Sequence, residues 1–315
     1  MRVEEDRCAG AEIKKRKISR EGVFMAGAMR VVKPLITGMK LERKRSGHNL
    51  LGKIRGVPKT LKSFPAEDCP LDAEWILPAC PAPLPSDTVF LFIHGGSYLT
   101  GSLIGSRPVA GLLCEVSGVR TITFAYRLAP EHPYPAALED ALKMWEYLLI
   151  QGISPQHILL VGESAGGGLA MALTMLLRDK GRDLPGGIVG ISAWADLTET
   201  SGSHIRCEKI DPIINSDELR AAAVKYSAGE SLKNPYISPV YGDFRGFPPT
   251  LLHVGSREVL LDDTESLYLK LREAGAPVRL SVYEGMWHVW HGFDIPESRD
   301  AMQEIRQFAY DVTKG

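Results

Sequence analysis

The segment Gly162-Glu163-Ser164-Ala165-Gly166 has the pattern Gly-x-Ser-x-Gly and directly follows an apolar, β-prone run. A stretch of small and apolar residues, typical of a buried helix, comes next. In this strand–turn–helix context the serine stands on a tight turn, and the flanking glycines remove Cβ atoms that would collide with the neighbouring strand and helix. We therefore expect Ser164 to be a nucleophile, with the N–H of Ala165 facing the negative charge that develops during the reaction. The alternative is a glycine-rich turn that serves packing alone.

A second glycine-rich turn, His94-Gly95-Gly96-Ser97, follows another apolar run. Acyl transfer needs two or more N–H donors aimed at the tetrahedral oxyanion, and such a turn can supply them. We expect the N–H groups of Gly95 and Gly96, together with that of Ala165, to form the oxyanion hole. His94 is expected to anchor this loop by hydrogen bonding rather than to titrate in the mechanism.

A serine hydroxyl is a weak nucleophile at neutral pH until a histidine takes its proton. The sequence contains eight histidines. His288 is the preferred candidate, because a short turn connects it to the β-prone run 278–283 and brings it to the top of the expected sheet. His291, one helical turn further along, is the fallback.

The histidine in turn needs a carboxylate that fixes its tautomer and stabilises its protonated form. Glu258 lies in the turn directly past the β-prone run 250–254, at the carboxyl end of a strand, where α/β sheets place functional groups. Asp262 and Asp263 open the following helix, where acidic residues commonly act as caps. Asp196, just past another strand, is a further reachable carboxylate. Glu258 is our choice for the acid, with Asp262 as the main alternative.

Short β-rich runs alternate with helical patterns from about residue 73 onward. This alternation is typical of an α/β fold with a mostly parallel sheet between helices. The expected strands lie at 89–93, 121–126, 158–161, 188–194, 250–254 and 278–283. The clearest helical patterns lie at 136–150, 167–177 and 262–273.

The alternation lapses between about 200 and 247, and the first fifty residues show helical spacing without strands. We interpret both regions as parts of a helical cap over the sheet. The expected organisation is N-terminal cap helices (1–50), the first part of the core (51–199), a cap insertion (200–235) and the second part of the core (236–315).

The composition excludes several classes of function. The chain has 315 residues, 44% hydrophobic, with 37 basic and 38 acidic side chains, which is typical of a globular protein rather than a disordered one. This balance leaves no overall positive field that would gather nucleic acid. The short basic run Lys14–Lys17 is interpreted as a solvated surface without a function of its own.

The sequence also gives expectations for the compartment of the protein and for the state of its cysteines. No stretch reaches the ~18 apolar residues of a membrane span, and acidic residues stand near the N-terminus where a secretory signal would be basic and then apolar. The cysteines are odd in number, widely spaced and without a nearby histidine cluster. We therefore expect a cytoplasmic protein with free thiols. The five cysteines are Cys8, Cys69, Cys80, Cys114 and Cys207.

Taken together, these motifs resemble the hormone-sensitive-lipase-like branch of the α/β-hydrolase family, which includes arylacetamide deacetylases and bacterial carboxylesterases. The resemblance covers about residues 75 to 312. It rests on His94–Ser97, on the string Tyr-Arg-Leu-Ala-Pro-Glu-His-Pro-Tyr-Pro-Ala-Ala at 126–137, on Gly162–Gly167 and on Asp211-Pro212. The string at 126–137 is the hardest of these to obtain by chance.

The resemblance implies an α/β-hydrolase fold with a helical cap, and no metal or cofactor. It implies Ser164 as nucleophile and His288 as base, in the chain order Ser164, Glu258, His288 that this fold uses. Three positions depart from the family pattern. Ser97 replaces a third glycine, Glu163 replaces the more frequent aspartate beside the nucleophile, and Glu258 stands where the family usually has aspartate. We interpret Glu163 as structural.

The expected function is that of a serine carboxylic-ester hydrolase acting on short- to medium-chain acyl esters through an acyl-enzyme. The same triad would also serve a lactonase, an amidase or a deacetylase, so these remain alternatives. A ligand receptor on the same scaffold is an alternative of another class; the plant gibberellin receptors resemble this family but lack the catalytic histidine. The expected partner is a small ester, and a homodimer through the edge strand nearest the C-terminus is plausible. The natural substrate is left open.

Overall fold

The computed structural model describes residues 12–14 and 18–314. The acidic N-terminal residues, Cys8 and Lys15–Lys17 of the basic run therefore lie outside the described residues. Lys14, the remaining member of that run, forms an ion pair with Glu12 at 2.7 Å. The four described cysteines are free thiols.

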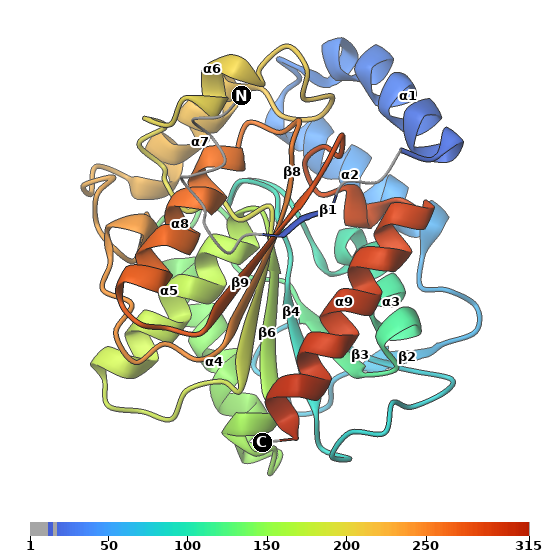
Figure 1. The fold of residues 1–315 in the computed structure, drawn as a ribbon, viewed down its shortest axis with the longest axis vertical. Coiled ribbons are helices and arrows are strands. Elements are labelled where there is room, and N and C mark those ends of the chain that lie inside the picture. The colour runs from blue at the N-terminus through green and yellow to red at the C-terminus, as the bar shows by residue number, and fades with distance from the viewer. Residues whose placement is uncertain (1–11, 15–17, 315) are drawn as a thin grey trace.

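A single sheet organises the described part of the chain (Figure 1). Its strand order is β1-β9-β8-β7-β6-β4-β5-β3-β2. All neighbouring pairs are parallel except β5–β3 and β3–β2, which are antiparallel. The strands are β1 (Glu12–Lys14), β2 (Lys62–Pro65), β3 (Ala73–Leu77), β4 (Val89–Ile93), β5 (Arg120–Phe124), β6 (Ile158–Glu163), β7 (Gly187–Ile191), β8 (Thr250–Gly255) and β9 (Val278–Tyr283).

The expected fold class, a mostly parallel sheet between helices, is confirmed, and all six expected strands are present. The sequence patterns did not identify β1, β2 or β3. The run predicted at 188–194 also ends early, at Ile191, because Ser192 adopts a positive φ of 49° and turns the chain away from the strand direction.

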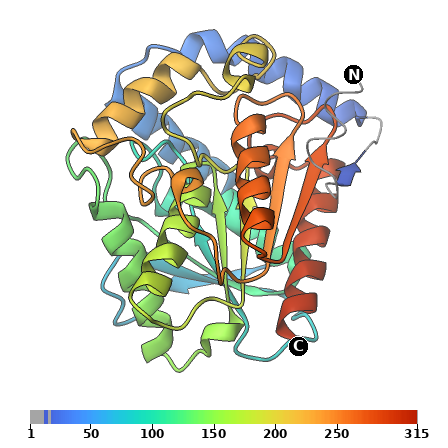
Figure 2. The ribbon, with the colours of Figure 1, turned by 60° about the vertical axis from the view of Figure 1, so that its left-hand side comes forward.

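Helices cover both faces of the sheet (Figures 1 and 2). The helices are α1 (Arg20–Ile36), α2 (Leu41–Arg55), α3 (Leu103–Ser117), α4 (Ala136–Ile150), α5 (Ala165–Asp179), α6 (Ser203–Arg206), α7 (Ser216–Ser227), α8 (Leu261–Glu273) and α9 (Pro296–Thr313). Along β4, Leu91 and Ile93 pack with residues of α4, α5 and α8. Phe90 and Phe92 pack with residues of α3 and α9 on the other face. Because both faces are covered, the inner strands are apolar at nearly every position.

The regions expected to form a cap lie at one end of the sheet. Figures 1 and 2 both show α1, α6 and α7 together at the end of the molecule opposite the C-terminus. The expected boundary at residue 50 falls inside α2, which continues to Arg55. The division into cap and core segments therefore stays a proposal in its details. Within the described residues, no helix has the length and apolar character that crossing a bilayer requires.

The strand expected to mediate dimerisation, β9, has a partner on its outer side. Residues Ser281–Tyr283 of β9 pair in parallel with β1. That stretch of β9 is therefore not a free edge onto which a second copy could add a strand. The homodimer stays a prediction.

The string at 126–137 is linked to α4 by a buried carboxylate. The side chain of Asp140 is fully buried. It accepts hydrogen bonds from the backbone N–H of Arg127 at 2.9 Å and from its guanidinium Nε at 2.8 Å. Lys143 adds a further ion pair at 2.9 Å. Asp140 therefore positions the segment that follows β5 against the first turn of α4.

We expect Asp140→Asn to lower the free energy of unfolding by about 2 kcal/mol, because the bonds that Arg127 and Lys143 donate to this buried carboxylate lose their charged acceptor. Urea unfolding at pH 7 measures this loss. Glu139→Gln is the matched control, because Glu139 pairs with the same guanidinium but is 56% exposed; its loss should stay below about 0.5 kcal/mol. Equal losses in the two variants would show that burial of the carboxylate is not what matters.

Candidate functional site

Ser164 occupies a sharp turn between β6 and α5. Its φ of 52° lies in the left-handed region, which a residue with a side chain rarely adopts. A Cβ added at Gly162 would stand 2.2 Å from the carbonyl oxygen of Gly166, and one at Gly166 would stand 2.1 Å from that of Ile93. Both distances are shorter than any real contact, so the turn requires glycine at these two positions.

The structure brings Ser164, His288 and Glu258 into one hydrogen-bonded chain. His288 Nε2 lies 3.0 Å from Ser164 Oγ. His288 Nδ1 lies 2.8 Å from Glu258 Oε2. All three side chains are buried. The imidazole therefore connects the hydroxyl to the carboxylate, which is the arrangement that a serine nucleophile and its base require.

The carboxylate of Glu258 is held from two further sides. Its Oε1 accepts the N–H of Gly255 at 2.6 Å and the hydroxyl of Ser192 at 3.0 Å. Ser192 Oγ also accepts the N–H of Val289 at 3.2 Å. Ser192 thus ties the acid to the loop that carries His288. Sequence analysis did not identify Ser192, and the only local signal was a small polar residue interrupting an apolar run.

Asp211 fixes the same acid loop from the cap insertion. Its Oδ2 accepts the N–H of Val259, the residue after Glu258, at 3.1 Å. Its Oδ1 accepts the N–H groups of Ile213 and Ile214. The Asp211-Pro212 pair was noted in the sequence as a mark of the family resemblance, without a role. In the structure it connects the insertion to the acid.

The negative charge beside His288 favours the protonated form of its imidazole. Burial by itself lowers the pKa of His288, but the hydrogen bond and the negative charge of Glu258 raise that pKa above its ordinary value. Glu163 lies nearby, and burial raises the pKa of its carboxyl to about 6, against the lowering effect of a hydrogen bond from Gly95.

The oxyanion-hole expectation for Gly95 stays a prediction, and one contact in the structure weighs against it. The N–H of Gly95 donates to Glu163 Oε1 at 3.2 Å, so it already has an acceptor. A Cβ at Gly95 would lie 3.0 Å from the Cβ of Ser164, so this glycine allows the loop to approach the nucleophile closely. In the structure the N–H of Gly95 is therefore occupied by the carboxylate of Glu163.

Three other N–H groups are available near Ser164. Gly96 and Ser97 have positive φ values of 111° and 54°. In the part of the chain that the structure describes, their N–H groups have no hydrogen-bond acceptor. Ala165 is the first residue of α5, where an N–H has no partner inside the helix. The candidate donors at the site are therefore the N–H groups of Gly96 and Ala165, which sequence analysis named, and that of Ser97, which it did not name.

His94 anchors its loop, as expected. Its Nδ1 lies 2.7 Å from the carbonyl oxygen of Gly95. Its ring stacks on Tyr126 with the ring centroids 4.1 Å apart, and the hydroxyl of Tyr126 donates to the carbonyl oxygen of His94 at 2.9 Å. Burial lowers the pKa of His94 to about 4, which keeps the ring neutral near pH 7.

The alternative residues have other partners. His291, the fallback base, is buried with its Nε2 3.1 Å from His253 Nδ1. Asp262 forms an ion pair with Arg206 at 2.7 Å. Asp263 accepts the hydroxyl of a serine, and Asp196 accepts the N–H of a threonine two residues later. Of these candidates, it is His288 that contacts Ser164, and it is Glu258 that contacts His288.

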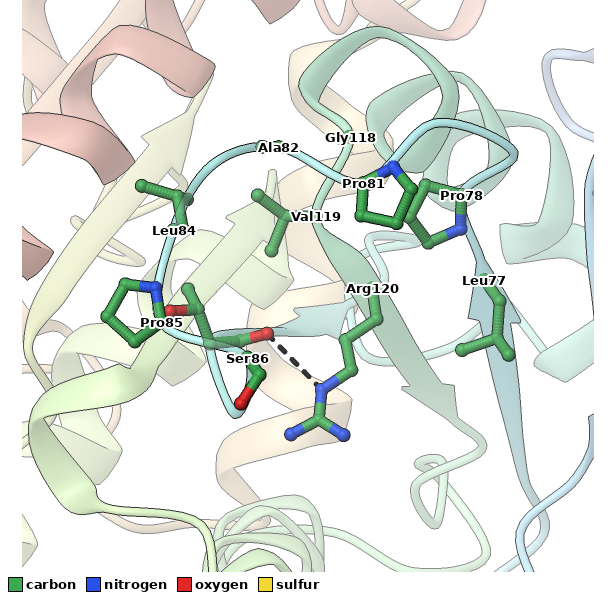
Figure 3. A pocket seen from close by; sticks show the side chains of 11 residues that line it. Leu77, Pro78, Pro81, Ala82, Leu84, Pro85, Ser86, Gly118, Val119 and Arg120 are labelled. Carbon is green, nitrogen blue, oxygen red and sulfur yellow. Dashed lines mark hydrogen bonds between the residues drawn. The ribbon is translucent and has the colours of Figure 1, made fainter.

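Neither a metal centre nor the cavity of Figure 3 belongs to this site. Within residues 12–14 and 18–314, no group of three or more His, Cys, Asp or Glu side chains could hold a metal ion. A cavity of about 220 Å³ is lined by residues that include Leu84, Val119 and Arg120. Figure 3 labels these three side chains and marks the hydrogen bond from Arg120 Nε to the carbonyl oxygen of Thr88. These residues lie at the amino ends of β4 and β5, whereas Ser164 follows the carboxyl end of β6.

Comparison with known proteins gives a consistent result. The family model for the alpha/beta hydrolase fold matches residues 90–292. An acetyl-hydrolase of Streptomyces hygroscopicus is 39% identical over 243 residues, which span 76% of this chain and 80% of that protein. An esterase/lipase from an uncultured bacterium has a similar structure, with a TM-score of 0.87, 33% identity, and coverage of 94% of this chain and 100% of the other. An esterase from the bacterial hormone-sensitive lipase family has a TM-score of 0.87 at 32% identity, over 95% of this chain and 100% of its own. The chain therefore belongs to the α/β-hydrolase family, in the hormone-sensitive-lipase-like branch that its motifs indicated.

Proposed function

We propose that this protein is a serine carboxylesterase that hydrolyses short- to medium-chain acyl esters through an acyl-enzyme. The observation that carries the proposal is the continuous hydrogen-bonded chain from Ser164 Oγ through His288 to Glu258. The names of the relatives, acetyl-hydrolase and esterase, support ester hydrolysis and a small acyl group. The intact histidine beside the serine argues against a receptor that has lost catalysis.

In the acylation step, Ser164 Oγ attacks the ester carbonyl carbon while its proton passes to His288 Nε2. The carbonyl π electrons move to the oxygen, which becomes the oxyanion of a tetrahedral intermediate. When the intermediate collapses, the bond to the alcohol breaks, and the alcohol leaves with the proton from His288. The product is an ester between Ser164 and the acyl group.

In the deacylation step, a water molecule gives a proton to His288 Nε2 and attacks the acyl carbon. A second tetrahedral intermediate forms, and its collapse returns the proton to Ser164 Oγ and releases the acid. Glu258 keeps the Nδ1–H of His288 directed at its own carboxylate, which leaves Nε2 free to accept a proton. Its negative charge also stabilises the imidazolium of both steps.

Within this proposal the oxyanion is bound by the N–H groups of Gly96, Ser97 and Ala165. Gly95 is left out because its N–H donates to Glu163. Fixed backbone donors are effective here because they need no reorganisation when the charge appears, and each such donor contributes a factor of about 10²–10³ in rate.

A panel of p-nitrophenyl esters tests the function, with a lactone and an anilide as comparisons. We expect the acetate and butyrate to be hydrolysed faster than the dodecanoate, the lactone and the anilide. Ser164→Ala should lower kcat by more than about 10³-fold, because no nucleophile remains. Ser106→Ala, which removes a buried hydroxyl outside the site, serves as the control. Turnover retained by Ser164→Ala would exclude the proposed nucleophile.

The acid can be tested separately. Glu258→Gln should lower kcat by about 10²–10⁴-fold, because the amide neither fixes the imidazole in the same way nor balances its positive charge. Asp262→Asn should change kcat only a few-fold, since Asp262 pairs with Arg206 instead. Steady-state rates on p-nitrophenyl acetate measure both effects. If Asp262→Asn were the more damaging substitution, the choice of Glu258 would be wrong.

The pH dependence of kcat/KM reports the charge on His288 in the free enzyme. Only the neutral imidazole accepts the proton of Ser164, so activity should fall as the pH drops through the pKa of His288. Because Glu258 raises that pKa, the midpoint of this limb is expected above 6.5, the ordinary value for histidine. In Glu258→Gln the raising charge is gone, and the midpoint of the residual activity should move to lower pH. An unchanged midpoint would contradict the proposed electrostatic coupling.

A further inference from the structure

The outward face of α1 is apolar. Phe24, Val31 and Leu35 have exposed fractions of 74%, 72% and 73%. Their spacing of seven and then four residues places them on one side of the helix. We call these three side chains the α1 outer stripe. A solvent-facing helix normally carries polar side chains on that side, so the stripe needs an explanation.

The orientation of α1 is fixed by contacts on its other side. Ser19 caps the helix by accepting the N–H of Gly22 and donates its hydroxyl to Glu297 at 2.9 Å. Met25 packs against the buried cluster that contains Trp287, next to His288. Lys33 Nζ donates to the backbone carbonyl oxygens of residues 208 and 211 at 3.0 and 2.9 Å. The outer stripe therefore faces away from the protein because the inner face is occupied.

Exposed apolar side chains are concentrated in this region. Of the fifteen large apolar side chains that are exposed in the described part of the chain, nine lie in residues 20–55. Leu50, Leu51 and Ile54 of α2 are among them, with exposed fractions of 58%, 52% and 73%. Single exposed apolar residues are common on proteins, but a concentration of this kind marks an interaction surface.

The same region is strongly basic. Residues 20–55 contain nine lysines and arginines against two glutamates, a net charge of +7, whereas the whole chain has a net charge of -1. Lys44 and Arg45 form ion pairs with Glu218 and Glu131. The exposed basic side chains of this region include Arg20, Arg30, Lys40, Arg43 and Lys53.

We propose that α1 docks on the surface of anionic lipid bilayers, with the outer stripe inserted at the level of the headgroups and the neighbouring basic side chains facing lipid phosphates. Exposed apolar side chains together with basic ones are the signature of a helix that lies in a membrane interface. An anionic surface also adds an attraction for each lysine or arginine close to it. A second copy of this chain fits less well, because it would bring two basic regions face to face.

Helices α1 and α2 also contact segments next to the candidate active site. Arg45 of α2 donates to the carbonyl oxygen of Leu99 at 2.8 Å, five residues after His94. Met25, on the inner side of α1, reaches the cluster beside His288. Docking would therefore place the site close to esters dissolved in the bilayer. The docking itself does not depend on the proposed hydrolysis, and it can be measured without turnover.

Co-sedimentation of the full chain with vesicles tests the proposal. Vesicles of phosphatidylcholine with about 30% phosphatidylglycerol should bind the protein at least about tenfold more strongly than phosphatidylcholine alone, and high salt should weaken the binding. The triple variant Phe24→Ser, Val31→Ser, Leu35→Ser should lose at least about tenfold in partitioning. Ile150→Ser is the matched control, because Ile150 is 81% exposed at the end of α4; it should bind as the wild type does. Ser164→Ala should also bind normally.

A second variant covers the case in which the triple variant does not fold, as judged by circular dichroism. Arg20→Gln with Arg30→Gln should weaken binding to the anionic vesicles and leave the weak binding to neutral vesicles unchanged. Equal binding to both kinds of vesicle, or no binding to either, would overturn the proposal. Wild-type self-association that the triple variant abolishes, without vesicle binding, would instead assign the outer stripe to a second copy of the chain.

Discussion

The site is organised around the buried carboxylate of Glu258. A carboxylate without exposure, as at Glu258, is costly unless hydrogen bonds compensate for the lost water. The structure supplies an N–H from Gly255, a hydroxyl from Ser192 and the imidazole of His288. These groups come from the ends of β8 and β7 and from the loop after β9. Satisfying the carboxylate therefore also fixes the histidine, since the two requirements share the same bonds.

Close approach of backbone segments is the second constraint. Gly166 passes the carbonyl oxygen of Ile93 at a distance that leaves no room for a side chain, and a Cβ at Gly95 would make a tight contact of 3.0 Å with the Cβ of Ser164. Glycine at these positions lets the turn of Ser164 and the candidate oxyanion donors come this close. Glu163 adds a polar contact at the same junction by accepting the N–H of Gly95. The glutamate that departs from the family pattern thus joins the nucleophile turn to the glycine-rich loop.

Local patterns were sufficient for the inner strands and for the residues that meet at Ser164. The inner strands are apolar runs covered on both faces, and each candidate residue follows the end of a strand. The outer strands were missed for physical reasons: β1 has three residues, and all four residues of β2 are exposed, so neither shows a burial pattern. The sequence placed Ser164, Glu258 and His288 near one edge of the sheet, and the structure adds the distances between them.

What sequence could not supply are contacts between distant segments. Gly95 was expected to serve the oxyanion, but the acceptor of its N–H is 68 residues away on Glu163. The role of Ser192 depends on β7 ending beside β8, where its hydroxyl meets a glutamate 66 residues later. Which acceptor a donor finds depends on the side chains that pack around it in the folded chain. A local sequence pattern carries no information about those neighbours.

The segments expected to form a cap contact the loops of the candidate site. Asp211 of the insertion accepts the N–H of the residue after Glu258. The ring of Tyr226 in α7 stacks on Tyr98, beside the glycine-rich loop, with the ring centroids 3.7 Å apart. Each contact pairs a cap element with a loop that positions a catalytic candidate. A displacement of these elements would therefore strain the loop after β8 and the glycine-rich loop together, so both elements support the geometry of the candidate site.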